Sequence, residues 1–555
     1  MFPQKVRQGR GWAWSILLGV VVLAGCSEEG TGDGLDLFVY NAADGIRSLD
    51  PARATDLETL WIVDQLYEGL LEFDAALHVV PALAESWSVS EDGLTLGFRL
   101  RSDAVFHDGS PLRAEDVVRS FARMLDPAEA LPGRWVLDGL RKENGIEGIG
   151  EDSLVLRLVA PNPVFPSLLA TPQASILKGG GLDGDPNVDD LGTGPFLLKG
   201  WLAETAMVLH RHPQYWMRDE GGRRLPRLDG VRIEFNREEG AEMLGFRQGR
   251  YDFVSAPKPE WMDVFFEEDG QWKPEWEGRF ERHSVPFLKT DYIGLLMDSA
   301  SCASLGLSPI DARVRRAMSL ALDRRLLVQE LRAGGASVAR GFVPHGMPGF
   351  TADERPVHPH LRHDPEAARA LLVEVGIGTE PPLTRRSVGT LGTKPATAEL
   401  AAALQHAWSE YGLDLDIDVA PSGIDAERVA RSEVPLFRKS WLADYPDAEN
   451  FLGLFDSVRW TPGGPNYTRH ADQRVDSLLH AASLLPTGEE RLALLREAER
   501  LVLDAMPVIP LWHDDVLHLV STAWSGWRVT PNNRLDLRHV EPVSYTHLTL
   551  PTNGC

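Results

Sequence analysis

Short apolar runs and helical stretches alternate along most of the chain. The run Leu35–Tyr40 predicts a strand, and Ser88–Gly93 predicts a hairpin turn that leads into a second strand, Leu94–Leu100. Apolar residues spaced three and four apart predict helices over 56–71 and 312–331. Further strands are predicted at 154–159, 208–211, 231–235 and 292–297, and further helices from 113 to 125 and at 365–374, 396–411 and 489–504. Strands that alternate with helices over such a length indicate an α/β architecture.

The first 25 residues have the pattern of a secretory signal peptide. Three basic residues precede the apolar run Trp12–Leu23, which is shorter than the ~20 residues of a membrane-spanning helix. The run ends in Leu-Ala-Gly-Cys26, which resembles the lipobox of bacterial lipoproteins. This resemblance implies cleavage before Cys26 and a lipid on its thiol; the alternative is an uncleaved anchor with an incidental cysteine. The polar, glycine-rich segment from Cys26 to residue 34 is then a flexible tether.

Composition narrows the classes of function. The chain has 555 residues, of which 43% are hydrophobic and 25% charged, so it is neither mainly disordered nor fibrous. At about 100–200 residues per domain, several domains are expected. Lys and Arg number 56 and Asp and Glu 81, a net charge of −25, which would repel a phosphate backbone and argues against a nucleic-acid partner. Three cysteines exclude a disulfide framework and a four-thiolate zinc site.

A series of collinear motifs narrows the function further. The most diagnostic is Leu83–Arg101, with the sequence LAESWSVSEDGLTLGFRLR. The other motifs are FHDGSP at 106–111, AEDVV at 114–118, GTGPF at 192–196, HPQYW at 212–216, VRRAMSLALDR at 314–324, HDPEAARALL at 363–372, ADYPD at 443–447 and PVIPL at 507–511. In this order they resemble the family 5 solute-binding proteins, the peptide- and nickel-binding receptors of ABC importers. The likeness extends from about residue 35 to residue 540.

The resemblance implies an α/β class II periplasmic-binding-protein fold, with two lobes joined by a hinge and the additional domain of the peptide binders. Carried over, lobe I comprises 35–67, 191–284 and 513–542, the additional domain 68–190, and lobe II 285–512. A chain that crosses repeatedly between lobes allows a hinge of a few backbone positions. The expected protein is a monomeric receptor, lipid-anchored on the periplasmic or cell-surface side of the membrane, which delivers a peptide to the permease of an ABC transporter.

The segment Pro435–Tyr445 contains the charges that a peptide receptor needs. In a strand, Arg438 and Asp444 would share one face. The resemblance implies that Asp444 pairs with the ligand ammonium and that Arg438 helps to bind the ligand carboxylate. Leu442 stands where some relatives carry a cysteine. Two alternatives stay open, because Asp444 could cap a turn and Arg438 could pair with a local carboxylate.

Three further residues are candidates for ligand contact. Trp441 and Tyr445 could form a wall of the cleft, although aromatic residues beside a strand also serve as core. Lys394 lies in a loop before a predicted helix, where some family members place a cation for the ligand carboxylate. No cofactor and no metal are expected.

The main rival classes are an extracytoplasmic hydrolase and a sensor or adhesin. The chain contains no His-Glu-x-x-His, Gly-x-Ser-x-Gly or Walker motif, so an enzyme is not expected. A nickel, haem or other small-solute ligand stays open within the family. Four histidines between Pro344 and Pro365 are interpreted as a solvated loop rather than as metal ligands. Residues 543–555 resemble a read-through artefact without function, and we do not expect Cys555 to pair with Cys302.

Overall fold

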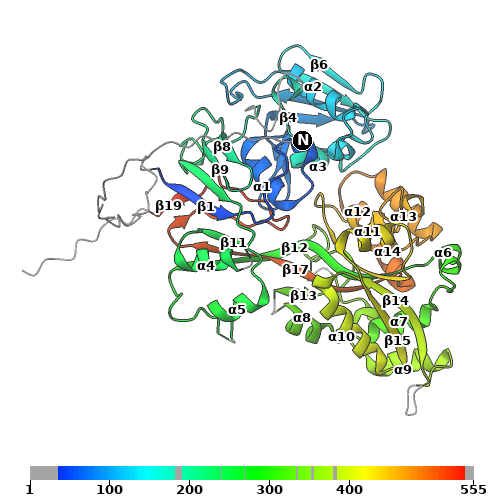
Figure 1. Cartoon of the computed structure of the whole chain (residues 1–555). Helices are drawn as coiled ribbons and strands as arrows, with labels where there is room; N and C mark the ends of the chain where they lie inside the picture. Colours follow the sequence, from blue (N-terminus) through cyan, green and yellow to red (C-terminus); the bar gives the residue numbers. More distant parts are fainter. Residues whose placement is uncertain are drawn as a thin grey trace, which may run out of the picture.

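The structure is a computed structural model that describes residues 35–543, apart from 182–190, 239, 268, 333–334, 352–354 and 379–383 (Figure 1). The predicted signal peptide, the predicted lipid-attachment residue Cys26 and the segment from Ser544 to Cys555 lie outside the described residues. None of the described helices has both the length and the apolar character needed to cross a membrane.

One large mixed sheet runs through most of the molecule. At its centre, β12 (Phe280–Leu295) pairs antiparallel with β17 (Val508–Ser521). Beyond β12 follow β16 (Leu436–Leu442), β14 (Arg386–Thr393) and β15 (Leu413–Val419), and beyond β17 follow β11 (Phe253–Ser255), β1 (Leu37–Asn41), β10 (Gly230–Glu234), β9 (Ala206–Arg211) and β8 (Phe196–Leu202). The short strand β13 (Ala336–Val338) also pairs with β17, and β18 (Trp524–Ser525) pairs with β19 (Glu541–Pro542). Figure 1 shows β12 and β17 running from the part that contains β1 to the part that contains β14.

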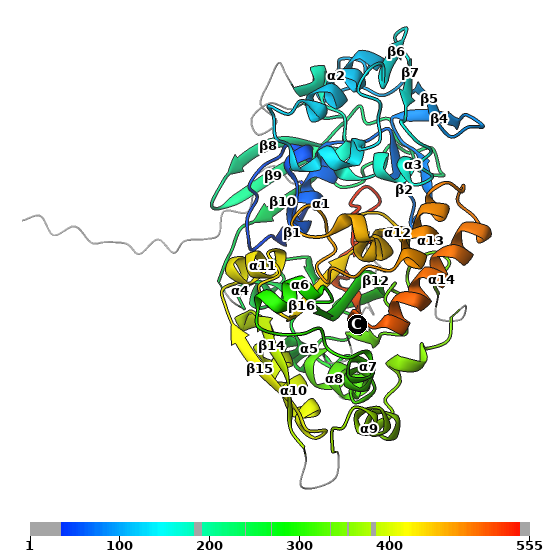
Figure 2. The same ribbon diagram turned by 90° about the vertical axis from the view of Figure 1, so that its right-hand side faces the viewer.

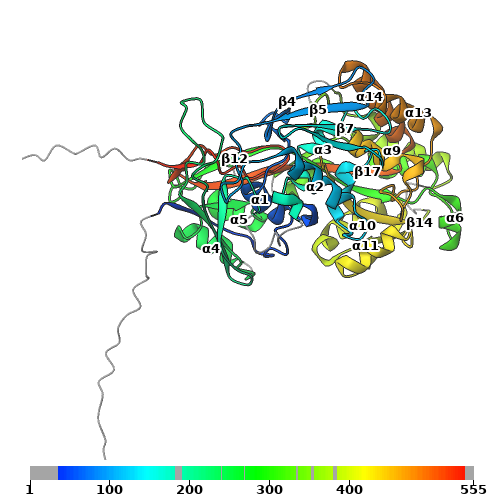
Figure 3. The same cartoon turned by 90° about the horizontal axis from the view of Figure 1, so that it is seen from above.

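The strands on either side of this pair belong to two separate lobes. Lobe I is built on β1 and β8–β11 with helices α1 (Leu57–Leu66), α4 (Ala241–Gln248) and α5 (Pro259–Phe265). Lobe II is built on β14–β16 with helices α6 (Ser299–Ser304), α7 (Ala312–Leu320), α8 (Arg324–Arg332), α9 (Pro365–Glu374), α10 (Ala398–Ser409), α11 (Ser422–Ala430), α12 (Glu449–Leu452), α13 (Gln473–Ser483) and α14 (Glu489–Ala505). Figure 3 shows α13 and α14 on one side of lobe II and α10 and α11 on the other.

A third part, the additional domain, lies above both lobes in Figure 2. Its four-stranded sheet has the order β4 (Ala84–Val89), β5 (Thr95–Leu100), β7 (Ser153–Arg157) and β6 (Ile146–Ile149). Helices α2 (Ala114–Leu125) and α3 (Phe165–Leu169) and the hairpin β2 (Leu71–Phe73)–β3 (Val79–Pro81) complete it. Each of the three parts buries its own apolar residues, and lobe I does so in two adjacent clusters, so the α/β architecture is confirmed. The exact segment boundaries of the domains stay a prediction.

Local sequence explains where many helices begin. An aspartate caps α1, α6, α7, α9 and α13, in each case by accepting a hydrogen bond from a backbone N–H of the first turn. In α2 the Asp116 carboxylate instead accepts from the backbone N–H of Arg113. Such caps satisfy donors that the helix itself leaves free.

Three predicted elements were wrong in extent. The helix predicted over 312–331 is two helices, because Asp323 caps α8 through the N–H groups of Arg325 and Leu326. Arg324, the first residue of α8, is buried and donates to the carbonyls of Ser319, Leu361 and Pro510.

The helix predicted over 56–71 ends at Leu66. The chain of Gly192 and Gly194 passes so close to the Leu66 carbonyl that a Cβ at either glycine would clash with it, and the Gly194 N–H donates to that carbonyl at 3.0 Å. The strand predicted at 292–297 begins much earlier, at Phe280. In the first half of β12, hydrophobic and polar residues do not alternate regularly, because several of the residues are charged. Tertiary pairing with β17 therefore decides the length of the strand.

The additional domain and lobe II contact each other through two reciprocal side chains. Leu77, at the tip of the β2–β3 hairpin, belongs to the buried core of lobe II and is 5% exposed. In the opposite direction, Tyr445 of lobe II packs against the core of the additional domain. These contacts hold the two parts together on one side of the space between the lobes.

The contact of Leu77 can be tested by truncation. We expect Leu77→Ala to shift the ligand-free protein toward a more open arrangement, because removing a buried leucine side chain costs about 2–5 kcal/mol. Small-angle X-ray scattering should then give a larger radius of gyration than for the wild type. Val89→Ala, at an exposed position of the same domain, is the control, and an unchanged radius for Leu77→Ala would contradict the assigned contact.

Candidate functional site

A cavity of about 260 Å³ lies where the two lobes and the additional domain meet. Its walls come from six segments of the chain, of which two belong to lobe I, three to the additional domain and one to lobe II. The lining residues are Ala54, Thr55, Leu57, Leu60, Trp61, Asp64, Phe73, Pro132, Gly133, Trp135, Thr171, Pro172, Gln173, Leu442, Ala443, Asp444, Asn532, Asn533 and Arg534. Only three of these carry a charge.

Helix α1 and the C-terminal return form one wall of the cavity. The Trp61 indole N–H donates to the carbonyl of Asn533 at 2.7 Å. Arg534 donates to the Asp64 carboxylate through Nε at 2.8 Å and also through Nη2. This bidentate pair neutralises two of the three charges of the cavity wall.

The third charge, Asp444, lies on the opposite wall, two residues after the end of β16. The Asn450 side-chain amide donates to one oxygen of its carboxylate at 3.1 Å. Among the described residues, no cation forms an ion pair with Asp444. The side chain is open to the cavity, yet protein surrounds it, and this partial burial raises its pKa above the ordinary aspartate value. An ammonium group in the cavity would relieve that cost.

Trp441 and Tyr445 flank Asp444 in different roles. The Trp441 indole N–H donates at 2.8 Å to the same Asn450 that holds Asp444, so Trp441 orients the acid through its neighbour. Tyr445 packs against the additional domain, and burial raises its pKa. Neither side chain is among the residues that line the cavity.

Arg438 and Lys394 also lie outside the cavity wall. The Arg438 guanidinium pairs with Asp291 of β12, and both side chains are largely buried. This pair matches the alternative in which Arg438 binds a local carboxylate. Lys394 follows β14 directly. Burial raises the pKa of the nearby Asp425, and the positive charge of Lys394 offsets part of that rise. Ligand contact by these residues stays a prediction.

The strand that leads to Asp444 has an unpaired edge. On one side, all seven residues of β16 pair with β12. On the other side, only Leu436 and Phe437 pair with β14, and no other strand of the described chain continues that edge. Residues Arg438–Leu442 therefore keep backbone donors and acceptors that an extended ligand could use.

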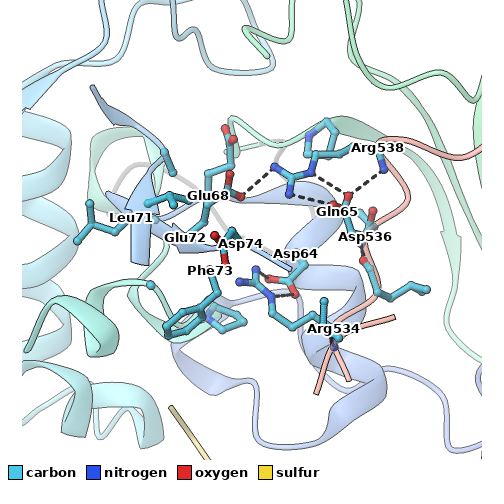
Figure 4. Close-up of a pocket in the computed structure, with 18 of the residues that line it drawn as sticks. Asp64, Gln65, Glu68, Leu71, Glu72, Phe73, Asp74, Arg534, Asp536 and Arg538 are labelled. Carbon is cyan, nitrogen blue, oxygen red and sulfur yellow. Dashed lines mark hydrogen bonds and ion pairs between the residues drawn. The ribbon is translucent and has the colours of Figure 1, made fainter. Parts of the chain in front are cut away.

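A second cavity, of about 210 Å³, adjoins the first. The lining residues common to both are Asp64, Phe73, Thr171, Pro172, Asn532 and Arg534. Figure 4 shows Arg538 between the carboxylates of Glu72 and Asp536 in this cavity. Here Glu68 is buried and accepts hydrogen bonds from the Tyr215 hydroxyl at 2.8 Å and from the Trp216 indole N–H at 3.0 Å. Burial raises the pKa of Glu68 to about 7.

A family model covers well over half of the chain. Residues 78–462 match the model of the bacterial extracellular solute-binding proteins, family 5, middle region. The chain belongs to this family. Its members are extracytoplasmic binding proteins, so the protein is a solute-binding protein and not an enzyme.

Several characterised proteins are similar over nearly their whole length. The probable di/tripeptide-binding protein 5 of Pseudomonas aeruginosa is 29% identical over 92% of this chain and 94% of its own. The periplasmic murein peptide-binding protein MppA of Escherichia coli is 26% identical over 90% and 92%. A solved structure of MppA in an unliganded open form superposes with a TM-score of 0.74 at 23% identity, covering 92% of this chain and 98% of that one. This likeness confirms the two-lobed periplasmic-binding-protein fold.

The four histidines between Pro344 and Pro365 belong to no metal-binding cluster in the part of the chain that the structure describes. Among the described residues, no group of three or more His, Cys, Asp or Glu side chains is placed to hold a metal ion. His358 and His360 are partly buried beside each other, and burial lowers the pKa of both. Cys302 is buried and forms no disulfide with any described residue.

Sequence reasoning missed several residues of the site. Asn450 positions Asp444, but it has no distinguishing pattern in the sequence. Asp64 and Arg534 are 470 positions apart, so no local signal connects them. Asp291, the partner of Arg438, lies in the part of β12 that was not predicted as a strand.

The burial of Glu68 in the second cavity can be tested through its raised pKa. Its folded-state pKa of about 7 lies above the ordinary glutamate value, so the ionised form destabilises the fold, and the destabilisation develops as the pH rises from about 4.5 to about 7. We expect the melting temperature of Glu68→Gln, relative to the wild type, to rise between pH 5 and pH 8. Differential scanning calorimetry measures this difference, and a difference that is constant with pH would contradict the assignment.

Proposed function

We propose that the protein binds short peptides in the cavity between its lobes and serves as the substrate-binding component of an ABC importer. The observation that carries the proposal is the Asp444 carboxylate, which faces the cavity at the end of a strand with a free edge and has no cationic partner among the residues that the structure describes. A peptide offers an ammonium group for such an acid and a backbone for such an edge. The names of the relatives, which bind di-, tri- or murein peptides, support this ligand class.

In this proposal the ligand lies extended along Arg438–Leu442, with its amino terminus at Asp444. Binding free energy comes from the charge-assisted contact and from main-chain hydrogen bonds. Trp441 acts by fixing Asn450, and Tyr445 acts by holding the additional domain against lobe II. Lys394 is a candidate for contact with the far end of the ligand, and Arg438 could bind that end only if its pair with Asp291 opened.

We further infer the cellular arrangement from the sequence and the family. The body of the receptor comprises lobe I (35–67, 191–284 and 513–542), the additional domain (68–190) and lobe II (285–512). A lipid on Cys26 and the tether that follows it would hold a monomeric receptor at the outer side of the membrane, where it delivers peptide to its permease. Mass spectrometry of the mature N-terminus tests the anchor, and an unmodified Cys26 would contradict it.

The ligand contact of Asp444 is tested by an isosteric change. We expect Asp444→Asn to weaken the binding of tri-alanine by about tenfold or more, because a hydrogen bond to a charged group contributes about 1.5–3 kcal/mol and 1.4 kcal/mol corresponds to tenfold. Isothermal titration calorimetry measures the affinity. Asp416→Asn, an exposed aspartate of β15 in the same lobe, is the control. Equal affinities of the two variants would refute the role of Asp444.

The same contact predicts a pH dependence. The Asp444 carboxylate must be ionised to pair with an ammonium group, and its pKa in the ligand-free protein is raised by burial. Peptide affinity should therefore begin to fall at a pH above the ordinary aspartate pKa of about 3.9. Titrations between pH 7 and pH 4 check this, and Asp444→Asn should lack this part of the pH dependence. A wild-type profile that coincides with that of the variant would count against the proposal.

A further inference from the structure

The pair between Arg438 and Asp291 has a consequence for ligand choice. Asp291 is 1% exposed and Arg438 16% exposed, and burial lowers the pKa of the arginine. Lys289 also contacts the Asp291 carboxylate, at 3.3 Å. A carboxylate this deeply buried needs its cations close by, because an uncompensated buried charge is costly.

The neighbouring cations, Lys289 and Arg332, also form ion pairs with carboxylates of the protein. Lys289 pairs with Asp514 of β17 as well as with Asp291, and Arg332 pairs with Asp514 at 2.8 Å. Each of the three cations thus has a carboxylate partner within the protein. Arg332 is more than one-third exposed, so water also solvates its charge.

This cluster lies beside the lobe II wall of the cavity. In the pairing of β12 with β16, Lys289 stands opposite Leu442 and Asp291 opposite Ser440. Leu442 lines the cavity. Because side chains alternate along a strand, Arg438 and Leu442 share one face of β16. A ligand that extends from Asp444 along the strand would therefore approach a cation whose charge is already neutralised.

We propose that Asp291 takes the place of the ligand carboxylate at Arg438, so that the receptor selects its ligand by a free amino group and is indifferent to the carboxyl end. This inference rests on the proposed peptide binding. The ligand class consists of peptides with a free amino terminus that end in a carboxylate, end in an amide or continue beyond the cavity. A ligand carboxylate would have to displace Asp291 and leave that buried acid short of a cation. Asp291 is thus a specificity-determining residue.

The test compares three ligands on the full-length protein by isothermal titration calorimetry: tri-alanine, tri-alanine amide and N-acetyl-tri-alanine. We expect the acid and the amide to bind within about threefold of each other, and acetylation to weaken binding by about tenfold or more. If acetylation has no effect, or if none of the three binds, the proposed function itself fails. If acetylation weakens binding but amidation also weakens it by about tenfold, only the present inference fails.

Three variants assign the effect to Asp291. In Asp291→Asn, Arg438 loses its carboxylate partner and is free to bind the carboxylate of the ligand. Tri-alanine should then bind about tenfold more tightly than its amide. Adding Arg438→Met to Asp291→Asn should abolish that preference. Arg438→Met alone, which serves if Asp291→Asn does not fold, should leave the acid-to-amide ratio at its wild-type value. An unchanged ratio in folded Asp291→Asn, or a ratio altered by Arg438→Met alone, would overturn the inference.

Discussion

The architecture depends on the pairing of two long strands that belong to both lobes. From Phe280 opposite Ser521 to Gly294 opposite Val508, β12 and β17 pair almost throughout. The register shifts twice, by one residue between Asp291 and Tyr292 and over a longer gap between Pro286 and Thr290. In this gap the Leu288 carbonyl accepts from Ala443 of the cavity wall, and the Leu288 N–H donates to Pro531 at the start of the opposite wall. The backbone that joins the lobes is thus bonded to both faces of the cavity, so a rotation at this point would open or close it.

The electrostatics of the cavity follow from how the protein distributes its own ion pairs. Arg534 forms an ion pair with Asp64 and Arg438 forms one with Asp291, so the charges of these two arginines are neutralised within the chain. Within the described part of the chain, the side-chain partner of Asp444 is a neutral amide and no cation pairs with its carboxylate. This arrangement favours an ammonium-bearing ligand over an anionic one.

Much of the fold could be predicted from the sequence, because many helices and strands are specified by local patterns of residues. The spacing of apolar residues predicted α9, α10 and α14, and the hairpin turn before Leu94 predicted β4–β5. The break between α7 and α8 was missed because the buried Arg324 that stabilises it contacts segments far away in the sequence. The site was predicted in part for the same reason: the motif around Asp444 is contiguous, whereas its neighbours in space come from residues 54–73, 132–135, 171–173 and 532–534.

A peptide held between the lobes by its amino terminus would be visible in a crystal structure of the protein with tri-alanine bound. We expect the peptide ammonium within hydrogen-bond distance of the Asp444 carboxylate and the peptide backbone paired with the free edge of β16. A peptide bound elsewhere, or bound in the cavity with its carboxylate toward Asp444, would contradict it.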